Sequence, residues 1–135
     1  MIIPIDTLVA VADGTKCRLF RNRGAEPHVV LHELPEVDID SHNVGSGTRH
    51  RSATANPDRS RLEEDDHASS ASALLNRMVL EGKVENLVLI ADPRTLGEMR
   101  KQFHAATSAI LIGEIAKDLT GHSVEAITDA LGKAR

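Results

Sequence analysis

The sequence predicts one α/β domain over residues 1–135, built as a mixed sheet of about five strands with helices packed on its faces. Short apolar runs of strand length recur along the chain, and segments with helical periodicity separate the later ones. A chain of 135 residues has the length of a single domain, and its 41% hydrophobic and 27% charged residues are typical of a globular protein. One hydrophobic core is therefore expected.

The first third of the chain predicts an antiparallel meander. Residues 7–12 are apolar and end at Asp13-Gly14, which is a tight-turn signal. Residues 16–21 alternate polar and apolar side chains, and residues 28–34 form a third strand-like run. Three strands in succession, joined by turns, predict antiparallel neighbours.

The second half of the chain alternates helix and strand. A helix is expected from an acidic start at residues 63–66 to a stop at Gly82, because negative side chains suit the positive end of the helix dipole and glycine commonly ends a helix. A continuous apolar strand follows at residues 87–91, and Asp92 with Pro93 then opens the next helix.

A last strand at residues 110–115 and a closing helix capped by Ser123 complete the order β-β-β-loop-α-β-α-β-α. The β-α-β-α-β part requires parallel pairing with right-handed crossovers, whereas the opening meander is antiparallel. The predicted sheet is therefore mixed.

A long flexible loop is expected at residues 36–62, where hydrophobic residues become scarce. It exceeds the roughly 12–15 residues at which structureless connections become uncommon, and such loops are often functional. Its candidate binding residues for RNA or phosphate are Gly45, Gly47, Arg49, His50, Arg51, Arg59 and Arg61. Arginine forks suit phosphate oxygens, and glycine lets the backbone approach closely. The alternative is a solvated loop whose charges only keep it soluble.

Composition argues against several other functions. Phe20 and Phe103 are the only aromatic residues of the Phe, Trp and Tyr types, which argues against an aromatic platform for stacking RNA bases. The net charge of −4 speaks against broad adhesion to nucleic acid or to an anionic membrane. Any contact with RNA is therefore expected to be local.

Cysteine content and hydropathy predict a cytoplasmic location without a membrane partner. Cys17 is the only cysteine, so no internal disulfide can form, and its place in a strand-like run favours a small buried hydrophobe over a reactive thiol. No signal peptide is visible at residues 1–8, and no apolar run approaches the ~20 residues of a membrane span.

Three segments carry a family resemblance: residues 11–20 (VADGTKCRLF), 87–100 (LVLIADPRTLGEMR) and 114–120 (EIAKDLT). In this order they resemble the bacterial family named for a protein required for attachment to host cells. That family looks like a relative of the middle domain of archaeal and eukaryotic peptide-release factors and of the ribosome-rescue factor pelota. The resemblance implies an RNase-H-like mixed α/β fold and a role near translation.

The same resemblance implies a loop before the long helix, which in the release factors ends in a catalytic Gly-Gly-Gln tip. The corresponding stretch here, residues 45–51, reads GSGTRHR, and residues 36–62 contain no glutamine. No position in this loop can take the catalytic role, so peptidyl-tRNA hydrolysis by that mechanism is not expected. What the resemblance retains is a glycine-hinged loop presented at the edge of an α/β domain, as in pelota-like proteins that bind ribosomes without release chemistry.

Other residue groups suggest chemistry but have simpler explanations. His50, Asp65, Asp66 and His67 could suit zinc or manganese, yet their spacing matches no ligand motif and acids at a helix start suit the dipole.

Asp13, Asp92 and Asp118 each follow a strand and could converge as in a two-metal nuclease, although turn and cap roles are favoured for Asp13 and Asp92. The remaining groups are the serines at positions 69, 70 and 72, which lack a nucleophile elbow, and the strand histidines His28 and His32.

The sequence thus predicts a noncatalytic binding module with a ribosome or structured RNA as partner, and with no catalytic residue, metal or cofactor. Two alternatives stay open: a hydrolase, either esterase-like toward peptidyl-tRNA or a metal-dependent nuclease, and a protein-interaction factor in attachment to host cells. The sequence does not predict an oligomeric state.

Overall fold

The computed structural model describes residues 1–35 and 57–134, and within the helix that begins at residue 57 it describes side chains from residue 66 onward. The strands are β1 (Leu8–Ala12), β2 (Cys17–Asn22), β3 (Leu31–Glu33), β4 (Leu87–Ala91) and β5 (Leu111–Ala116). The helices are α1 (Pro57–Leu80), α2 (Pro93–Gln102), α3 (Ala105–Ala109) and α4 (Val124–Lys133).

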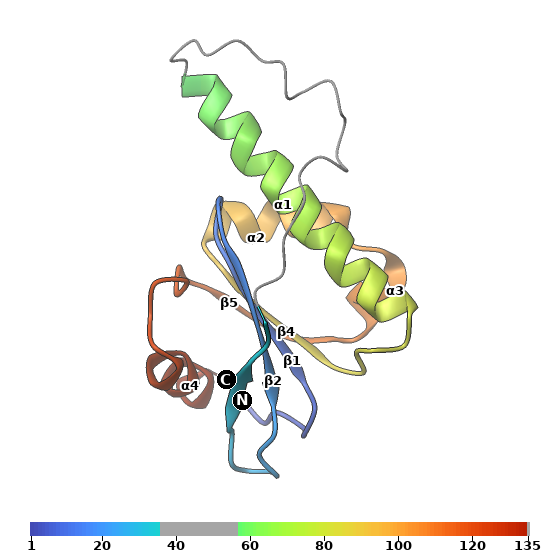
Figure 1. Ribbon diagram of the computed structural model, residues 1–135, viewed down its shortest axis with the longest axis vertical. Helices are drawn as coiled ribbons and strands as arrows, with labels where there is room; N and C mark the ends of the chain where they lie inside the picture. The colour runs from blue at the N-terminus through green and yellow to red at the C-terminus, as the bar shows by residue number, and fades with distance from the viewer. Residues whose placement is uncertain (36–56, 135) are drawn as a thin grey trace.

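The five strands form one mixed sheet in the order β3-β2-β1-β4-β5, with helices packed on it (Figure 1). β1 pairs antiparallel with β2, and β2 pairs antiparallel with β3, so the predicted meander is confirmed. β1 pairs parallel with β4, and β4 pairs parallel with β5. The predicted mixed α/β sheet is therefore confirmed.

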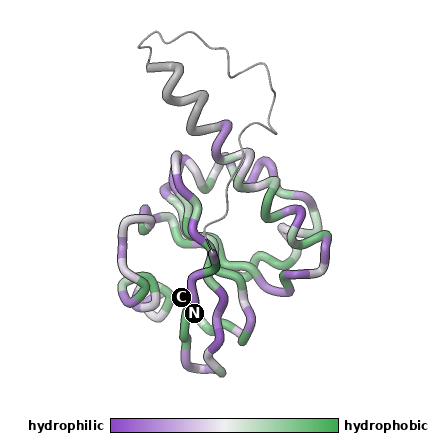
Figure 2. The backbone as a smooth tube through the Cα atoms, in the orientation of Figure 1, coloured by the Kyte–Doolittle hydropathy of each residue, from purple (hydrophilic) through white to green (hydrophobic). Residues whose placement is uncertain are grey.

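β1 and β4 are buried on both faces, because helices cover both sides of the sheet. α1 and α2 lie on one face and α4 lies on the other (Figure 1). The first face packs, among others, Leu8, Ala10, Leu87 and Leu89 of the strands against Ala68, Ala71, Leu75, Leu96 and Met99 of the helices. The second packs Val9, Val11, Val88 and Ile90 against Ile127 and Leu131. Alternate strand residues thus serve opposite faces, and Figure 2 shows the hydrophobic strands at the centre of the molecule.

α1 begins earlier than the sequence predicted. Its first residue is Pro57, whereas the acidic run suggested a start at residues 63–66. Proline is favoured at the first helical position, since its missing N–H has no intrahelical partner there. Residues 57–62 are therefore helix and not loop, and the rest of the predicted loop lies outside the described residues.

The end of α1 follows the glycine signal. The Lys83 N–H donates to the Met78 carbonyl at 3.0 Å, the Gly82 N–H donates to the Val79 carbonyl at 3.0 Å, and Gly82 has a φ of 76°. This is the Schellman arrangement, in which a residue in the left-handed region closes the helix. Gly82 therefore ends α1 as predicted.

The short helix α3 was missed. Its cap is His104, whose Nδ1 accepts a hydrogen bond from the Ala106 N–H at 3.0 Å. Histidine is not among the residues preferred at this position, so the sequence carried no cap signal.

None of the described helices is long and apolar enough to cross a membrane.

Candidate functional site

The carboxyl ends of the parallel strands meet at one edge of the sheet, which we call the carboxyl edge. Asp13 follows β1, Asp92 follows β4, and Asp118 follows β5 by two residues. In open α/β sheets this edge is where ligands commonly bind. The predicted convergence of these three carboxylates can therefore be compared with the structure at this edge.

Asp13 organises the turn between β1 and β2. Its Oδ1 accepts hydrogen bonds from the Thr15 N–H at 2.7 Å, the Lys16 N–H at 2.6 Å and the Thr15 hydroxyl at 3.1 Å. Its backbone N–H donates to the Lys16 carbonyl at 2.9 Å. Aspartate is common in turns because its carboxylate can accept from the backbone just ahead of it.

Thr120 joins this turn to the segment after β5. Its Oγ1 lies 2.7 Å from Asp13 Oδ2 and 2.8 Å from Asp118 Oδ1, so a single hydroxyl hydrogen serves two carboxylates. Thr120 is 7% exposed. Burial alone would raise the pKa of Asp13, but the hydrogen bonds from Thr120, Thr15 and Lys16 outweigh it and lower the pKa below its usual value.

Asp92 does not join this pair. It caps α2, where its side chain accepts from the Thr95 N–H at 3.1 Å. The predicted cap role of Asp92 and turn role of Asp13 are therefore confirmed. Within residues 1–35 and 66–134, no group of three His, Cys, Asp or Glu side chains is placed to hold a metal ion.

Arg18 holds the same edge together from β2. Its guanidinium makes two hydrogen bonds to the Glu33 carboxylate, at 2.9 and 2.8 Å, and Nη1 donates to the carbonyls of Thr120 and His122 at 3.0 and 2.8 Å. It also lies 5.1 Å from the ring centroid of Phe20. The hydrogen bonds from Arg18 lower the pKa of Glu33, and those to Glu33 raise the pKa of Arg18.

His67 brings α1 to this edge. Burial lowers the pKa of His67, while the Asp13 charge and a hydrogen bond with the Asp13 backbone act in the opposite direction. The buried Nδ1 of His67 has no hydrogen-bond partner among the described residues. His67 thus places the helix stem beside the Asp13 turn.

These contacts make the carboxyl edge a rigid support. The oxygens of Asp13 already accept from Thr15, Lys16 and Thr120, and both Glu33 oxygens accept from Arg18. Burial raises the pKa of the nearby Cys17 thiol to about 12, so this sulfur is not a nucleophile at neutral pH, as the sequence predicted. The arrangement positions α1 and the β1–β2 turn.

The predicted loop residues are only partly placed. Gly45, Gly47, Arg49, His50 and Arg51 lie outside the described residues. Arg59 and Arg61 belong to α1, so their assignment to a loop was wrong, and the structure does not describe their side chains. Their predicted contact with RNA or phosphate stays a prediction.

The serines of α1 have structural roles where the structure describes their bonds. The Ser70 hydroxyl donates to the Asp66 carbonyl at 3.0 Å, and the Ser72 hydroxyl donates to the Met99 carbonyl at 3.3 Å. His28 lies outside β3, and both His28 and His32 are exposed.

Sequence reasoning missed Thr120 and Arg18. Their contacts join residues 107 and 102 positions apart in the chain, which no local pattern encodes. The one usable signal was the DGTKCR segment at residues 13–18, where a turn aspartate is followed closely by an arginine in a strand.

The fold and the carboxyl edge define an α/β domain in which the Asp13 turn packs against the long helix α1. The family described as bacterial archaeo-eukaryotic release factor family 12 matches residues 6–131, so the chain belongs to that family. The relation to release factors expected from the sequence is thereby confirmed. The chain is a domain of a translation-related family.

The chain is also similar to an uncharacterized protein of Rickettsia prowazekii (strain Madrid E). The two are 29% identical over 75 residues, which is 52% of this chain and 50% of that protein. The chain spans about half the length of this curated relative.

Proposed function

We propose that this chain is a noncatalytic, cytoplasmic binding module that acts in translation, with a ribosome or structured RNA as its partner. The observation that carries the proposal is the family assignment over residues 6–131. The fold supports it, because the described strands and helices pack into one sheet-and-helix body that can carry a binding segment.

The contact in this proposal is made by residues 45–61. Arg49, Arg51, Arg59 and Arg61 oppose one acid, Asp58, which gives this stretch an excess of three positive charges in a chain of net charge −4. Arginine binds phosphate oxygens in a bidentate manner, and such contacts position a protein on RNA without reading sequence.

The acidic run at residues 63–66 limits the extent of this contact. Four successive carboxylates would repel phosphate, so the RNA-facing part lies before residue 62. His67 follows this run directly and lies beside the Asp13 turn. The acidic run therefore separates the part of α1 that packs on the body from the part proposed to contact RNA. A fixed stem lowers the entropy that binding must overcome.

Finer features of the family resemblance belong to the same proposal. We propose that the sheet is RNase-H-like, and that the family named for attachment to host cells shares this domain. Residues 36–62 contain no glutamine, which supports binding without peptide release.

Cosedimentation with purified ribosomes in low salt tests the proposal. The variant with Arg49, Arg51, Arg59 and Arg61 changed to Ala should lose most of its ribosome-bound fraction. A control with the exposed residues Arg77, Lys101, Lys117 and Lys133 changed to Ala carries the same net charge of −8, since each set removes four positive charges from −4. Equal binding by both variants would remove residues 45–61 from the proposal.

A metal-dependent nuclease is the second candidate, favoured by the convergence of Asp13 and Asp118 on Thr120. A metal that binds only the folded chain raises its thermal stability by mass action. No rise in thermal stability with Mg²⁺, Mn²⁺ or Zn²⁺ in excess would exclude this candidate.

A protein-interaction role in attachment is the other alternative. Crosslinking that recovers proteins without RNA would favour it.

A further inference from the structure

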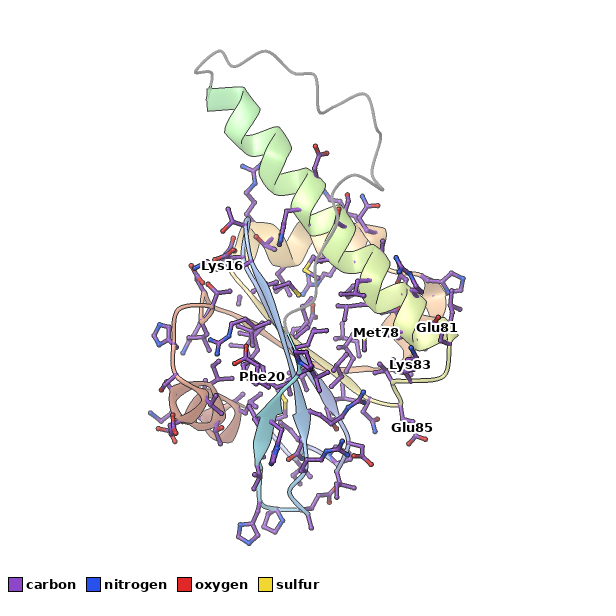
Figure 3. The ribbon with its side chains drawn as sticks, viewed as in Figure 1. Lys16, Phe20, Met78, Glu81, Lys83 and Glu85 are labelled. Carbon is purple, nitrogen blue, oxygen red and sulfur yellow. The ribbon has the colours of Figure 1, made fainter. Side chains whose placement is uncertain are left out.

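A second polar site lies at the opposite edge of the sheet. A surface pocket of about 300 Å³ is lined by Asp6, Arg21, Arg23, Gly82, Lys83 and Glu85. Asp6 precedes β1 and Glu85 precedes β4, and these strands are parallel, so the pocket lies at their amino ends. Figure 3 shows Lys83 and Glu85 on the connection between α1 and β4.

The guanidinium of Arg21 is held in place by the backbone. Its Nη1 donates to the carbonyls of Asp6 and Lys83, both at 3.1 Å, which uses both hydrogens of that nitrogen. The side chain is half-buried, and no carboxylate pairs with it among the described residues. As far as the described residues show, the Nε and Nη2 edge of Arg21 therefore remains available.

That edge has the geometry that binds an oxyanion. Nε–H and Nη2–H form the fork that fits two oxygens of one group, and a guanidinium fixed in advance loses little freedom on binding. The two carbonyls replace the restraint that a carboxylate partner usually supplies. Within residues 1–35 and 66–134, Arg21 is thus an oriented cation without a carboxylate partner.

Arg23 and Lys83 add two further cations to the same pocket. Both make exposed ion pairs, Arg23 with Asp6 at 2.7 Å and Lys83 with Glu81 at 3.3 Å, and exposed pairs of this kind contribute little to stability, so a ligand loses little by replacing them. Asp6 has a φ of 70°, in the left-handed region; its carbonyl accepts from Arg21 and its carboxylate accepts from Arg23.

From this geometry we infer that the pocket binds a phosphate group, with the Arg21 fork as its main contact and Lys83 or Arg23 as a second one. A dianion can engage two cations at once, whereas a carboxylate satisfies only the fork. Glu85 repels the anion from its own side of the pocket and favours a ligand with a hydrogen-bond donor there. The phosphate can come from a small phosphate ester or from an RNA backbone.

This site is separate from the helical part of the proposed contact, residues 57–61. Residues 57–80 form one helix, whose 24 residues span about 36 Å at about 1.5 Å per residue, and the pocket follows its last turn. The two sites can therefore succeed or fail independently.

Titration of the ¹⁵N-labelled chain with inorganic phosphate at constant ionic strength tests the inference. The amide signals of Asp6, Gly82 and Lys83 should shift saturably with phosphate and not with matched chloride. Arg21→Lys keeps the charge but loses the fork, so its dissociation constant should rise about tenfold or more. Lys117→Gln, at an exposed position directly after β5 at the carboxyl edge, should bind as the unchanged chain does.

Lys83→Gln guards against loss of the fold in the Arg21 variant. The Lys83 side chain is 62% exposed, so this change should leave the fold intact and weaken phosphate binding several-fold. Uridine 5′-monophosphate and a short RNA without terminal phosphates distinguish the two sources of the group. The inference would be overturned if none of the three probes gave a saturable shift. It would also be overturned if both pocket variants bound phosphate with the same affinity as the unchanged chain.

The variant with four alanines between residues 49 and 61 should still bind phosphate. Loss of phosphate binding in both pocket variants with normal ribosome cosedimentation would support two separate sites. Ribosome binding without any phosphate shift would overturn the pocket alone and leave the proposed function standing.

Discussion

Replacing Thr120 by Val removes the hydroxyl that links Asp13 to Asp118 and keeps nearly the same shape. The Oγ1 atom lies 2.7 Å from Asp13 Oδ2 and 2.8 Å from Asp118 Oδ1. A hydrogen bond to a charged group contributes roughly 1.5–3 kcal/mol, and the partial exposure of both carboxylates reduces this. We expect the free energy of unfolding to fall by about 1–2 kcal/mol at pH 7.

The pH dependence of this loss follows from the sign of the Asp13 shift. The pKa of Asp13 is lowered in the folded chain, so its contribution to stability is present above its usual value of 3.8 and is lost as the pH falls through the lower folded value. Without the Thr120 hydroxyl, burial remains and the pKa of Asp13 rises. The difference between the two chains should therefore be largest at pH 7 and shrink below pH 3.8.

Urea denaturation followed by circular dichroism at pH 7 and at pH 3 measures both effects. Thr128→Val is the control, because the Thr128 hydroxyl donates only to the Val124 carbonyl of its own helix, and its change should stay within about 0.5 kcal/mol. An equal loss at the two pH values, or no loss at pH 7, would refute the account of this edge.

Three further predictions concern packing and buried polar groups. Cys17 should react with a thiol reagent at pH 8 about 1,000-fold more slowly in the folded chain than in the unfolded one, because burial raises its pKa to about 12 and leaves little thiolate; comparable rates would contradict this. Gly24→Ala should lower the free energy of unfolding by about 1–3 kcal/mol in urea denaturation, since a Cβ there would lie 2.7 Å from the His28 carbonyl oxygen and 2.9 Å from the Val30 nitrogen, and both are backbone atoms. Asn22→Leu should cost about 2–4 kcal/mol in the same assay, because the fully buried amide accepts from the N–H groups of Gly24 and Val30 and donates to the carbonyls of two N-terminal residues; a loss below about 1 kcal/mol would show that water or a backbone shift replaces these bonds.

The central strands could be predicted because their burial is written in local composition. β1 and β4 are buried along their whole length, and a strand covered on both faces reads as a continuous apolar run. The Asp13-Gly14 turn, the Asp92 cap and the Gly82 stop likewise follow from the backbone preferences of single residues.

The start of α1 could not be predicted from apolar spacing. Between Pro57 and Ala68 the sequence holds Leu62 as its only aliphatic residue, so no apolar spacing marks these turns. The acidic run at residues 63–66 then resembled a helix start, although it lies inside the helix. Pro57 was the better signal.

The candidate site depended on long-range geometry. Asp13 and Asp118 were recognised as residues at strand ends, but the hydroxyl that joins them comes from a threonine with no distinguishing neighbours. The pocket at the amino ends of β1 and β4 also depends on long-range contacts. Two carbonyls, 15 and 62 positions away in the chain, orient the Arg21 guanidinium there. Only the folded chain brings these groups together.

The salt dependence of ribosome binding tests the central claim most directly. If the four arginines between residues 49 and 61 contact phosphates, replacing them with Ala should reduce the slope of log K against log salt concentration by about 3, at roughly 0.7–0.9 per contact. The control with Arg77, Lys101, Lys117 and Lys133 changed to Ala should keep the original slope. Equal slopes in all three chains, or no measurable binding by the unchanged chain, would contradict the claim.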